Sequence, residues 1–206
     1  MALGDPYVDL LTLKQYLRST LEGVDRYDDV LEQALASVSR EIEQYCRRQF
    51  NRTDTASPRL FVADAAGWVH VDDFHSVEDL VVETDPAGTF TESTIWAAAD
   101  YQLEPLNGTV GGVSGWPYYK IRAVGGERFT IGRRTTVRVT ARWGWAAVPA
   151  PVRQACLILA AETFQLKDAP FGVAGLDSMG AVLRVRDNKM AAAKLAPYRR
   201  DPVLVG

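Results

Sequence analysis

The stretch Val137-Arg-Val-Thr-Ala-Arg-Trp-Gly-Trp-Ala-Ala-Val-Pro-Ala-Pro-Val-Arg-Gln-Ala-Cys156 joins two kinds of secondary structure. Its first part alternates apolar and polar side chains, which is typical of a half-buried strand. Gly144, between Trp143 and Trp145, permits a sharp bend, and Pro149 suits the start of a helix. We therefore predict a structural junction at Trp143, Gly144, Trp145 and Pro149, with both indoles packed in a core rather than binding a ligand.

Helices are predicted on both sides of the chain's centre. Residues 152–167 are predicted to form a helix whose centre, residues 155–161, is apolar nearly all round, which indicates a helix buried on most sides. Its expected partner is an amphipathic helix near the N-terminus, with one apolar stripe formed by Leu31, Leu35, Val38, Ile42 and Tyr45. Thr12 is expected to cap a short preceding helix, Asp25 or Asp28 to open the long one, and Asp187 to cap a short last helix.

The middle of the chain reads as β structure, because short runs of β-branched and aromatic residues alternate with turn signals. The expected strands are residues 60–62, 68–71, 77–83, 89–96, 101–103, 118–122 and 136–143. Neither helical end could bury its apolar face alone, so the two must share a core. The predicted class is α+β: a helical bundle built from residues 1–57 and 146–197, an inserted antiparallel β domain at 58–145, and a C-terminal tail at 198–206.

Composition excludes several classes of protein. Hydrophobic residues make up 47% and charged residues 24% of the 206, so the chain can bury a core and is not disordered as a whole. The net charge of −3 favours neither a nucleic-acid nor a membrane surface. No signal peptide and no membrane-spanning run are expected. Cys46 and Cys156 are expected to be buried free thiols, and a single disulfide between them is kept as the alternative.

No catalytic, cofactor-binding or metal-binding residue is predicted. His70, Asp72, Asp73 and His75 form one His/Asp cluster, but alternation along a strand would put His70 and His75 on opposite faces. The glycine-rich residues 107–115 lack a following helix and a lysine, so they indicate a flexible hairpin tip or loop rather than a phosphate cradle. No Ser/His or Cys/His pair has a spacing that supports a nucleophile. An enzyme is therefore not expected.

Several motifs follow one another in an order that resembles a known family. They are Trp143-Gly-Trp145 running into Val148-Pro149-x-x-Val152-Arg153-x-Ala155, residues 167–175 (KDAPFGVAG), Leu13-Lys14-x-Tyr16-Leu17, Asp28-Asp29, Tyr45-Cys-Arg-Arg-Gln-Phe50 and Leu195-Ala-Pro-Tyr-Arg-Arg200. With these motifs the chain resembles the head–tail connector (adaptor) proteins of long-tailed phages, particularly actinobacteriophage members. The resemblance covers nearly the whole chain, but no motif falls within residues 58–135.

The resemblance implies a structural role in a virion neck, assembled in the host cytoplasm. Such adaptors form a homo-oligomeric ring, usually twelve-fold, beneath the portal protein. The ring extends the DNA channel, contacts passing genomic DNA without sequence specificity, and meets a tail-side neck protein, either a stopper or a tail terminator. The family carries no catalytic residues, no cofactor and no membrane contact.

The end of the chain is the expected contact surface. Between residues 184 and 201, six basic side chains oppose two acidic ones, which suits an acidic portal surface or weak contact with DNA. The apolar residues at the very end are expected to add to a neighbour as a strand or arm. The predicted portal or neighbour interface comprises Tyr198, Arg199, Arg200, Val203, Leu204 and Val205.

Two alternatives to the adaptor function are kept. Another neck component, a stopper or tail-completion protein, would share the location and the lack of chemistry, but such proteins are mostly β. A DNA-binding module could use the two N-terminal helices as a helix-turn-helix. Its recognition helix would begin with Asp25, Asp28, Asp29 and Glu32, which would meet phosphates unfavourably.

Overall fold

The structure is a computed structural model that describes residues 2–17, 25–166 and 188–200. The chain divides into two compact units: a helical unit formed by Leu3–Phe50 and Val148–Arg200, and a β unit formed by Asn51–Ala147. Helices combined with an antiparallel sheet confirm the predicted α+β class. Over the described ranges, no helix has the length and apolar character needed to cross a membrane.

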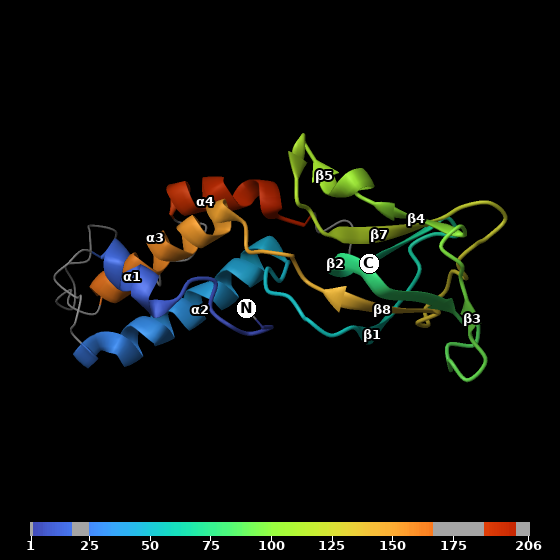
Figure 1. Cartoon of the computed structure of the whole chain (residues 1–206), viewed down its shortest axis with the longest axis horizontal. Coiled ribbons are helices and arrows are strands. Elements are labelled where there is room, and N and C mark those ends of the chain that lie inside the picture. Colours follow the sequence, from blue (N-terminus) through green and yellow to red (C-terminus); the bar gives the residue numbers. More distant parts are fainter. Residues whose placement is uncertain (1, 18–24, 167–187, 201–206) are drawn as a thin grey trace. The chain divides into compact units, whose positions relative to one another are not determined.

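The helical unit is built around two long helices that pack against each other (Figure 1). Its described elements are α1 (Leu10–Tyr16), η1 (Asp25–Tyr27), α2 (Asp28–Cys46), α3 (Ala150–Leu166), α4 (Lys189–Leu195) and η3 (Ala196–Tyr198). The predicted stripe on α2 is buried from Leu31 to Ile42, while Tyr45 is half-exposed. The matching face of α3 comprises Val152, Ala155, Cys156, Leu159, Ala160 and Phe164. Periodicity therefore identified the core of this unit correctly.

The long helix α2 begins at Asp28, one of the two predicted positions, whereas the caps of α1 and α4 differ from the prediction. The cap of α1 is Asp9, not Thr12, because the Asp9 carboxylate accepts hydrogen bonds from both the backbone N–H and the hydroxyl of Thr12, at 2.8 and 2.9 Å. The cap of α4 is Asn188, and Asp187 lies outside the described residues. Neither acidic candidate caps α2 with its side chain, since Asp28 is the first helical residue and accepts the Lys14 ammonium at 2.5 Å.

The β unit contains a six-stranded sheet with the order β1-β8-β2-β7-β4, and β3 pairs with β2 (Figure 1). Its strands are β1 (Ser57–Phe61), β2 (Trp68–Thr84), β3 (Thr94–Ile95), β4 (Tyr101–Glu104), β7 (Tyr118–Ala123) and β8 (Val137–Trp143); β5 (Thr109–Val110) and β6 (Val113–Ser114) form a separate hairpin. Alternate residues of β8 are buried, as predicted. The sheet encloses an apolar core that includes Val69, Phe74, Val82, Ile121, Val139 and Trp143.

Two predicted strands, residues 68–71 and 77–83, are one strand, β2. Its pairing with β7 and β8 shifts register between His70 and Phe74 and again before Val81, so the extra residues are accommodated as bulges. The consecutive residues Asp73 and Phe74 are both buried at this bend. A bulge interrupts the alternation of buried and exposed side chains along a strand. The sequence pattern therefore suggested two strands where there is one.

The predicted strand at residues 89–96 is mostly a loop, and only β3 pairs there. The carboxylate of Asp85 accepts backbone hydrogen bonds from Ala87, Thr89 and Phe90 at 2.7 to 2.8 Å. These hydrogen bonds lower the pKa of Asp85 below its usual value, and the bond from the Phe90 N–H has the largest effect. An aspartate that binds following N–H groups competes with strand formation, which explains the difference.

A charged pair between neighbouring strands should make the β unit sensitive to acid. Arg138 Nε and Nη2 donate to the Glu83 carboxylate at 2.7 and 2.5 Å, and Glu83 is 8% exposed. This pairing lowers the pKa of Glu83. Because the folded pKa lies below the unfolded one, the pair stabilises the fold above pH ~4.3 and the contribution is lost as pH falls through the folded pKa.

We therefore expect Glu83→Gln to lower the free energy of unfolding by about 2 kcal/mol at neutral pH. Chemical denaturation between pH 3 and pH 7 should also show a weaker acid dependence for this variant. The matched control is Glu78→Gln, since the Glu78 side chain in the pair with Arg142 is 67% exposed and should contribute less than about 1 kcal/mol. Equal losses in the two variants would contradict the prediction.

Candidate functional site

Two segments far apart in the sequence meet at the carboxyl end of α2. Arg47 ends this helix in a left-handed conformation with a φ of 52°. The backbone N–H of Arg200 donates to the carbonyl of Cys46 at 2.9 Å. This bond satisfies one of the last carbonyls of α2, which have no hydrogen-bond donor within the helix. The rings of Phe50 and Tyr198 meet edge to face with centroids 6.0 Å apart. The first three residues of the predicted tail, 198–200, are therefore packed on the helical unit.

The backbone contact between Arg200 and Cys46 brings together two pairs of consecutive arginines, here named the arginine cluster: Arg47, Arg48, Arg199 and Arg200, of which Arg48 is buried. The guanidinium of Arg199 lies 4.9 Å from the ring centroid of Tyr45, and both Arg47 and Arg199 are exposed. The cluster lies beside the carbonyl end of α2, where the helix dipole favours positive charge. Of the predicted interface residues, Tyr198, Arg199 and Arg200 are thus brought together, and Arg47 and Arg48 join them.

Other parts of the predicted interface fall beyond the described residues. Val203, Leu204 and Val205 belong to residues 201–206, and the family-like motif at 167–175 belongs to residues 167–187. The basic residues Arg184 and Arg186 of the C-terminal segment also lie in this second range.

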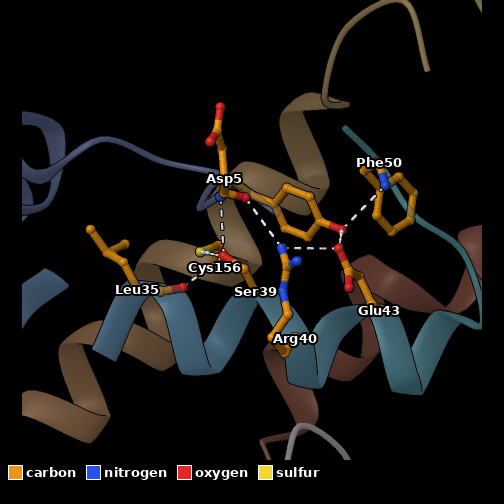
Figure 2. Close-up of polar contacts among 8 residues, drawn as sticks. Asp5, Leu35, Ser39, Arg40, Glu43, Phe50 and Cys156 are labelled. Carbon is orange, nitrogen blue, oxygen red and sulfur yellow. Dashed lines mark hydrogen bonds and ion pairs between the residues drawn. The ribbon is translucent and has the colours of Figure 1, made fainter. Parts of the chain in front are cut away.

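Tyr7 attaches the N-terminal segment to the same helical unit by contacts with Ser39, Glu43 and Phe50, which are labelled in Figure 2. The Tyr7 side chain is fully buried, and its hydroxyl donates to Glu43 Oε1 at 2.8 Å while accepting the N–H of Phe50 at 3.2 Å. Its backbone N–H donates to Ser39 Oγ at 3.0 Å. Burial, more than the neighbouring Glu43 charge, raises the pKa of Tyr7 far above its usual value. One tyrosine therefore links the N-terminus, α2 and the segment that leaves α2.

Polar contacts around Tyr7 extend this network (Figure 2). Arg40 donates to the carbonyl of Asp5 at 3.2 Å and pairs with Glu43 at 3.0 Å. Ser39 Oγ donates to the Leu35 carbonyl at 2.7 Å and lies 3.7 Å from Cys156 Sγ. Because Phe50 contacts both Tyr7 and Tyr198, the network supports the surface that carries the arginine cluster.

Both cysteines are buried free thiols, as predicted. Burial raises the pKa of Cys46 to about 12 and that of Cys156 to about 11. Reactive cysteines need a thiolate near neutral pH, so these two side chains act as small apolar core groups.

Sequence reasoning missed Tyr7, Arg47 and Arg48 as parts of this site. One signal was available for the N-terminal segment: Val8 and Leu13 flank the Asp9 cap at the positions of a hydrophobic staple, and both are buried. That spacing would have indicated that the residues before α1 are ordered. It could not have identified the partners of the Tyr7 hydroxyl.

The two tryptophans of the Trp-Gly-Trp motif pack inside the β unit, which confirms the predicted core role. Trp143 contacts the rings of Phe61 and Phe74, and its indole N–H donates to the Ser57 carbonyl at 2.8 Å. The Trp145 indole N–H donates to Asp73 Oδ2 at 2.9 Å. The carbonyl of Pro149 accepts the N–H of Arg153 at 3.0 Å and so begins α3.

Gly144 lies where two backbone segments cross at very short distance. Its φ is 92°, and a Cβ atom built there would lie 1.7 Å from the carbonyl oxygen of Asn51. Its N–H donates to the Asp73 carbonyl at 2.6 Å, and the next N–H, of Trp145, donates to Asn51 at 3.2 Å. Glycine is therefore required for the close approach as well as for the bend.

The candidate metal ligands do not converge on one point, because each contacts a different partner. Asp64 Oδ2 lies 3.1 Å from His70 Nδ1, Asp72 pairs with Arg59 at 2.6 Å, and His75 Nε2 lies 3.1 Å from the Thr53 carbonyl. Among the described residues, no group of three or more His, Cys, Asp or Glu side chains could hold a metal ion. The glycine-rich residues 107–115 form the β5–β6 hairpin, as predicted.

Comparison with known proteins found similarity at the level of fold. No family model and no curated protein matches the chain. A chain from the neck of an empty gene transfer agent (GTA) particle with C6 symmetry is 18% identical, with a TM-score of 0.54, and the match covers 97% of this chain and 93% of that one. A chain from the virion of a native GTA particle matches at 19% identity, with the same TM-score and coverages. A third, from a native GTA neck with C12 symmetry, matches at 18% identity and a TM-score of 0.50 over 100% of this chain and 99% of that one. At this identity, the likeness shows a shared fold.

Proposed function

We propose that this chain is a head-to-tail adaptor subunit, which forms a ring beneath the portal of a phage-like particle and extends its DNA channel towards the tail. The observation that carries the proposal is a fold shared over 97% or more of the chain with chains from GTA neck and virion structures. A twelve-fold ring is supported by the C12 symmetry of one of those necks. The order of family-like motifs favours an adaptor over a stopper or tail-completion protein, which is the second candidate.

In this proposal the arginine cluster docks on an acidic surface of the portal. Tyr198 and Arg199 are held in place by their contacts with Phe50 and Tyr45, so little side-chain entropy is lost on binding. Val203, Leu204 and Val205 follow directly in the chain and are proposed to add to the portal or to a neighbouring copy. Trp143, Gly144, Trp145 and Pro149 form the segment through which the β unit continues into α3.

Electron microscopy of the purified protein, with and without the portal protein of the same particle, tests the proposal directly. The expected result is a ring seated on the portal, with subunits on one face only. A protein that stays monomeric and leaves the portal bare would overturn the adaptor function. A ring that binds a tail tube but not the portal would favour the second candidate.

The docking surface has its own test. We expect Arg47→Gln/Arg199→Gln to weaken binding to the portal by at least about ten-fold, since charge pairs desolvated at an interface contribute about 1.4 kcal/mol or more. The matched control, Arg153→Gln/Lys189→Gln, removes two exposed charges elsewhere in the helical unit and should leave binding unchanged. Surface plasmon resonance on immobilised portal gives both values. Equal losses in the two variants would indicate a general charge effect and contradict the assignment.

A further inference from the structure

The positive charges of the β unit are distributed unevenly between paired and unpaired groups. Residues 51–147, all described by the structure, contain nine Lys and Arg side chains. Six of these form ion pairs with carboxylates at 3.2 Å or less: Arg52, Arg59, Lys120, Arg122, Arg138 and Arg142. The other three, Arg128, Arg133 and Arg134, all lie in the loop between β7 and β8 and are exposed.

This loop, residues 125–135, is here named the arginine loop (Figure 1). It is anchored at its middle by Phe129, which is 2% exposed and stacks on Trp96 with ring centroids 4.5 Å apart. The N–H of Phe129 donates to the Ala66 carbonyl at 2.9 Å, and the Thr136 hydroxyl donates to the Thr130 carbonyl at 2.8 Å. The three arginines are therefore exposed on a segment whose backbone is held by the core, although Arg128 also donates through Nη1 to the carbonyls of Gly125 and Glu127 at 3.4 and 2.6 Å.

Little negative charge opposes these arginines within the β unit. Within residues 125–135, three arginines and one glutamate, Glu127, give +3 − 1 = +2. The loop between β2 and β3, residues 85–93, approaches the arginine loop closely at Gly88, where an added Cβ would lie 2.8 Å from the Thr135 carbonyl oxygen. That loop carries two carboxylates, Asp85, which is already occupied by backbone N–H groups, and the exposed Glu92, while Glu83 on β2 is paired with Arg138. The arginine loop thus keeps its positive charge in a unit whose net charge is 9 − 12 = −3.

We propose that the arginine loop binds the phosphate backbone of duplex DNA. Guanidinium groups match phosphate geometry with two parallel hydrogen bonds. Single strands are held by exposed aromatic rings, and the loop's aromatic residue, Phe129, is buried, so duplex is favoured. Residues 125–135, all of them described, contain no helix or strand and only one isolated β-bridge, between Ile131 and Ala63, so the loop has no element to insert into a groove and the contact is independent of sequence. The choice of DNA as the polyanion rests on the proposed function.

The size of the effect follows from counterion release. Three phosphate contacts give a slope of log affinity against log salt of about −2.7, which is about a forty-fold loss of affinity between 50 and 200 mM salt. Removing two contacts should reduce the slope to about −0.9, so that the same change in salt costs about four-fold. The contact is weak for a single copy, and the measurement must suit weak binding.

Nuclear magnetic resonance titration of the isotope-labelled full chain with an unlabelled 20-base-pair duplex provides that measurement. The largest shifts are expected at residues 125–135, with the salt slope given above. Arg133→Gln/Arg134→Gln should abolish most of the shifts, whereas the control Arg153→Gln/Lys189→Gln should retain them. Side-chain resonances of the arginines report contact directly, and retained amide shifts elsewhere show that each variant is folded.

Three outcomes would overturn the proposal. Shifts confined to the arginine cluster would assign DNA contact to the helical unit. Unchanged affinity in Arg133→Gln/Arg134→Gln would exclude these arginines as ligands. Equal affinity for polyglutamate of the same charge would identify an acidic protein surface as the partner. Because the titration uses the isolated chain, it can fail while the ring still assembles on the portal, and it can succeed while the ring does not.

Discussion

Alanine in place of Gly144 is expected to cost the β unit at least about 3 kcal/mol of its free energy of unfolding, among the largest effects of a single substitution. A Cβ atom at this position would lie 1.7 Å from the Asn51 carbonyl oxygen and 2.9 Å from Arg52 Cα. Both obstacles are backbone atoms, so no side-chain rotation relieves the clash. Separation of the two segments would also break the hydrogen bonds that Gly144 and Trp145 donate to Asp73 and Asn51.

Gly115→Ala is the matched control for this prediction. Gly115 has a similar φ, 87°, and no described atom would lie within 4 Å of a Cβ added there, so only the conformational cost of about 1 kcal/mol is expected. Hydrogen exchange monitored by mass spectrometry would separate the two units. Gly144→Ala should increase exchange in β1, β2 and β8, whereas Gly115→Ala should not. A difference between the variants of less than about 1 kcal/mol would show that the crossing can relax.

Tyr7→Ala should destabilise the helical unit by about 4 kcal/mol, since it removes a fully buried aromatic ring. Tyr7→Phe keeps the ring but leaves the Phe50 N–H and the Glu43 carboxylate without the hydroxyl. That variant should lose about 2 kcal/mol, because the buried Phe50 N–H loses this acceptor, while Glu43 keeps its ion pair with Arg40. Comparison of Tyr7→Ala with Tyr7→Phe separates the contribution of ring packing to stability from that of the hydroxyl's hydrogen bonds.

Thermal and chemical denaturation of both Tyr7 variants give these values, with Tyr16→Ala as the control. Tyr16 is 47% exposed in α1, so its loss should cost less than about 1 kcal/mol. Tyr7→Ala should also increase hydrogen exchange at Phe50 and around Tyr198, because Phe50 contacts both rings. If Tyr7→Ala and Tyr16→Ala were equally mild, the N-terminal segment would not be part of the helical core.

The two proposed contacts lie on different units and use arginines in different settings. Arg199 is stacked on Tyr45 beside the end of α2, a pre-ordered arrangement that suits a protein surface. Arg133 and Arg134 extend from a glycine-containing loop without a carboxylate partner in the described part of the chain, which suits the repeating charge of a phosphate backbone. The paired variants proposed above distinguish these contacts, since each is expected to impair one kind of binding.

The periodic patterns of α2 and β8 were read correctly from the sequence, whereas the cap of α1 and the loop after Asp85 were not. The stripe from Leu31 to Ile42 and the alternation along β8 both predicted the buried faces, because helix and strand periods determine which side chains share a face. The α+β class followed from the order of these segments. The tryptophans of the junction and both cysteines were also correctly predicted to be core residues. These features are local, and burial of apolar area enforces them.

Tertiary structure alone decided the features that depend on partners distant in the sequence. Tyr7 finds Glu43 and Phe50 at separations of 36 and 43 residues, and nothing near Tyr7 encodes those partners. The arginine cluster exists because the segment after α4 returns to the end of α2. The arginines of the 125–135 loop were visible in the sequence, but only the ion pairs of the other six cations showed that these three are left unneutralised within the described β unit. Gly144, first read as a bend, proved to be a crossing point because Asn51 lies against it in space.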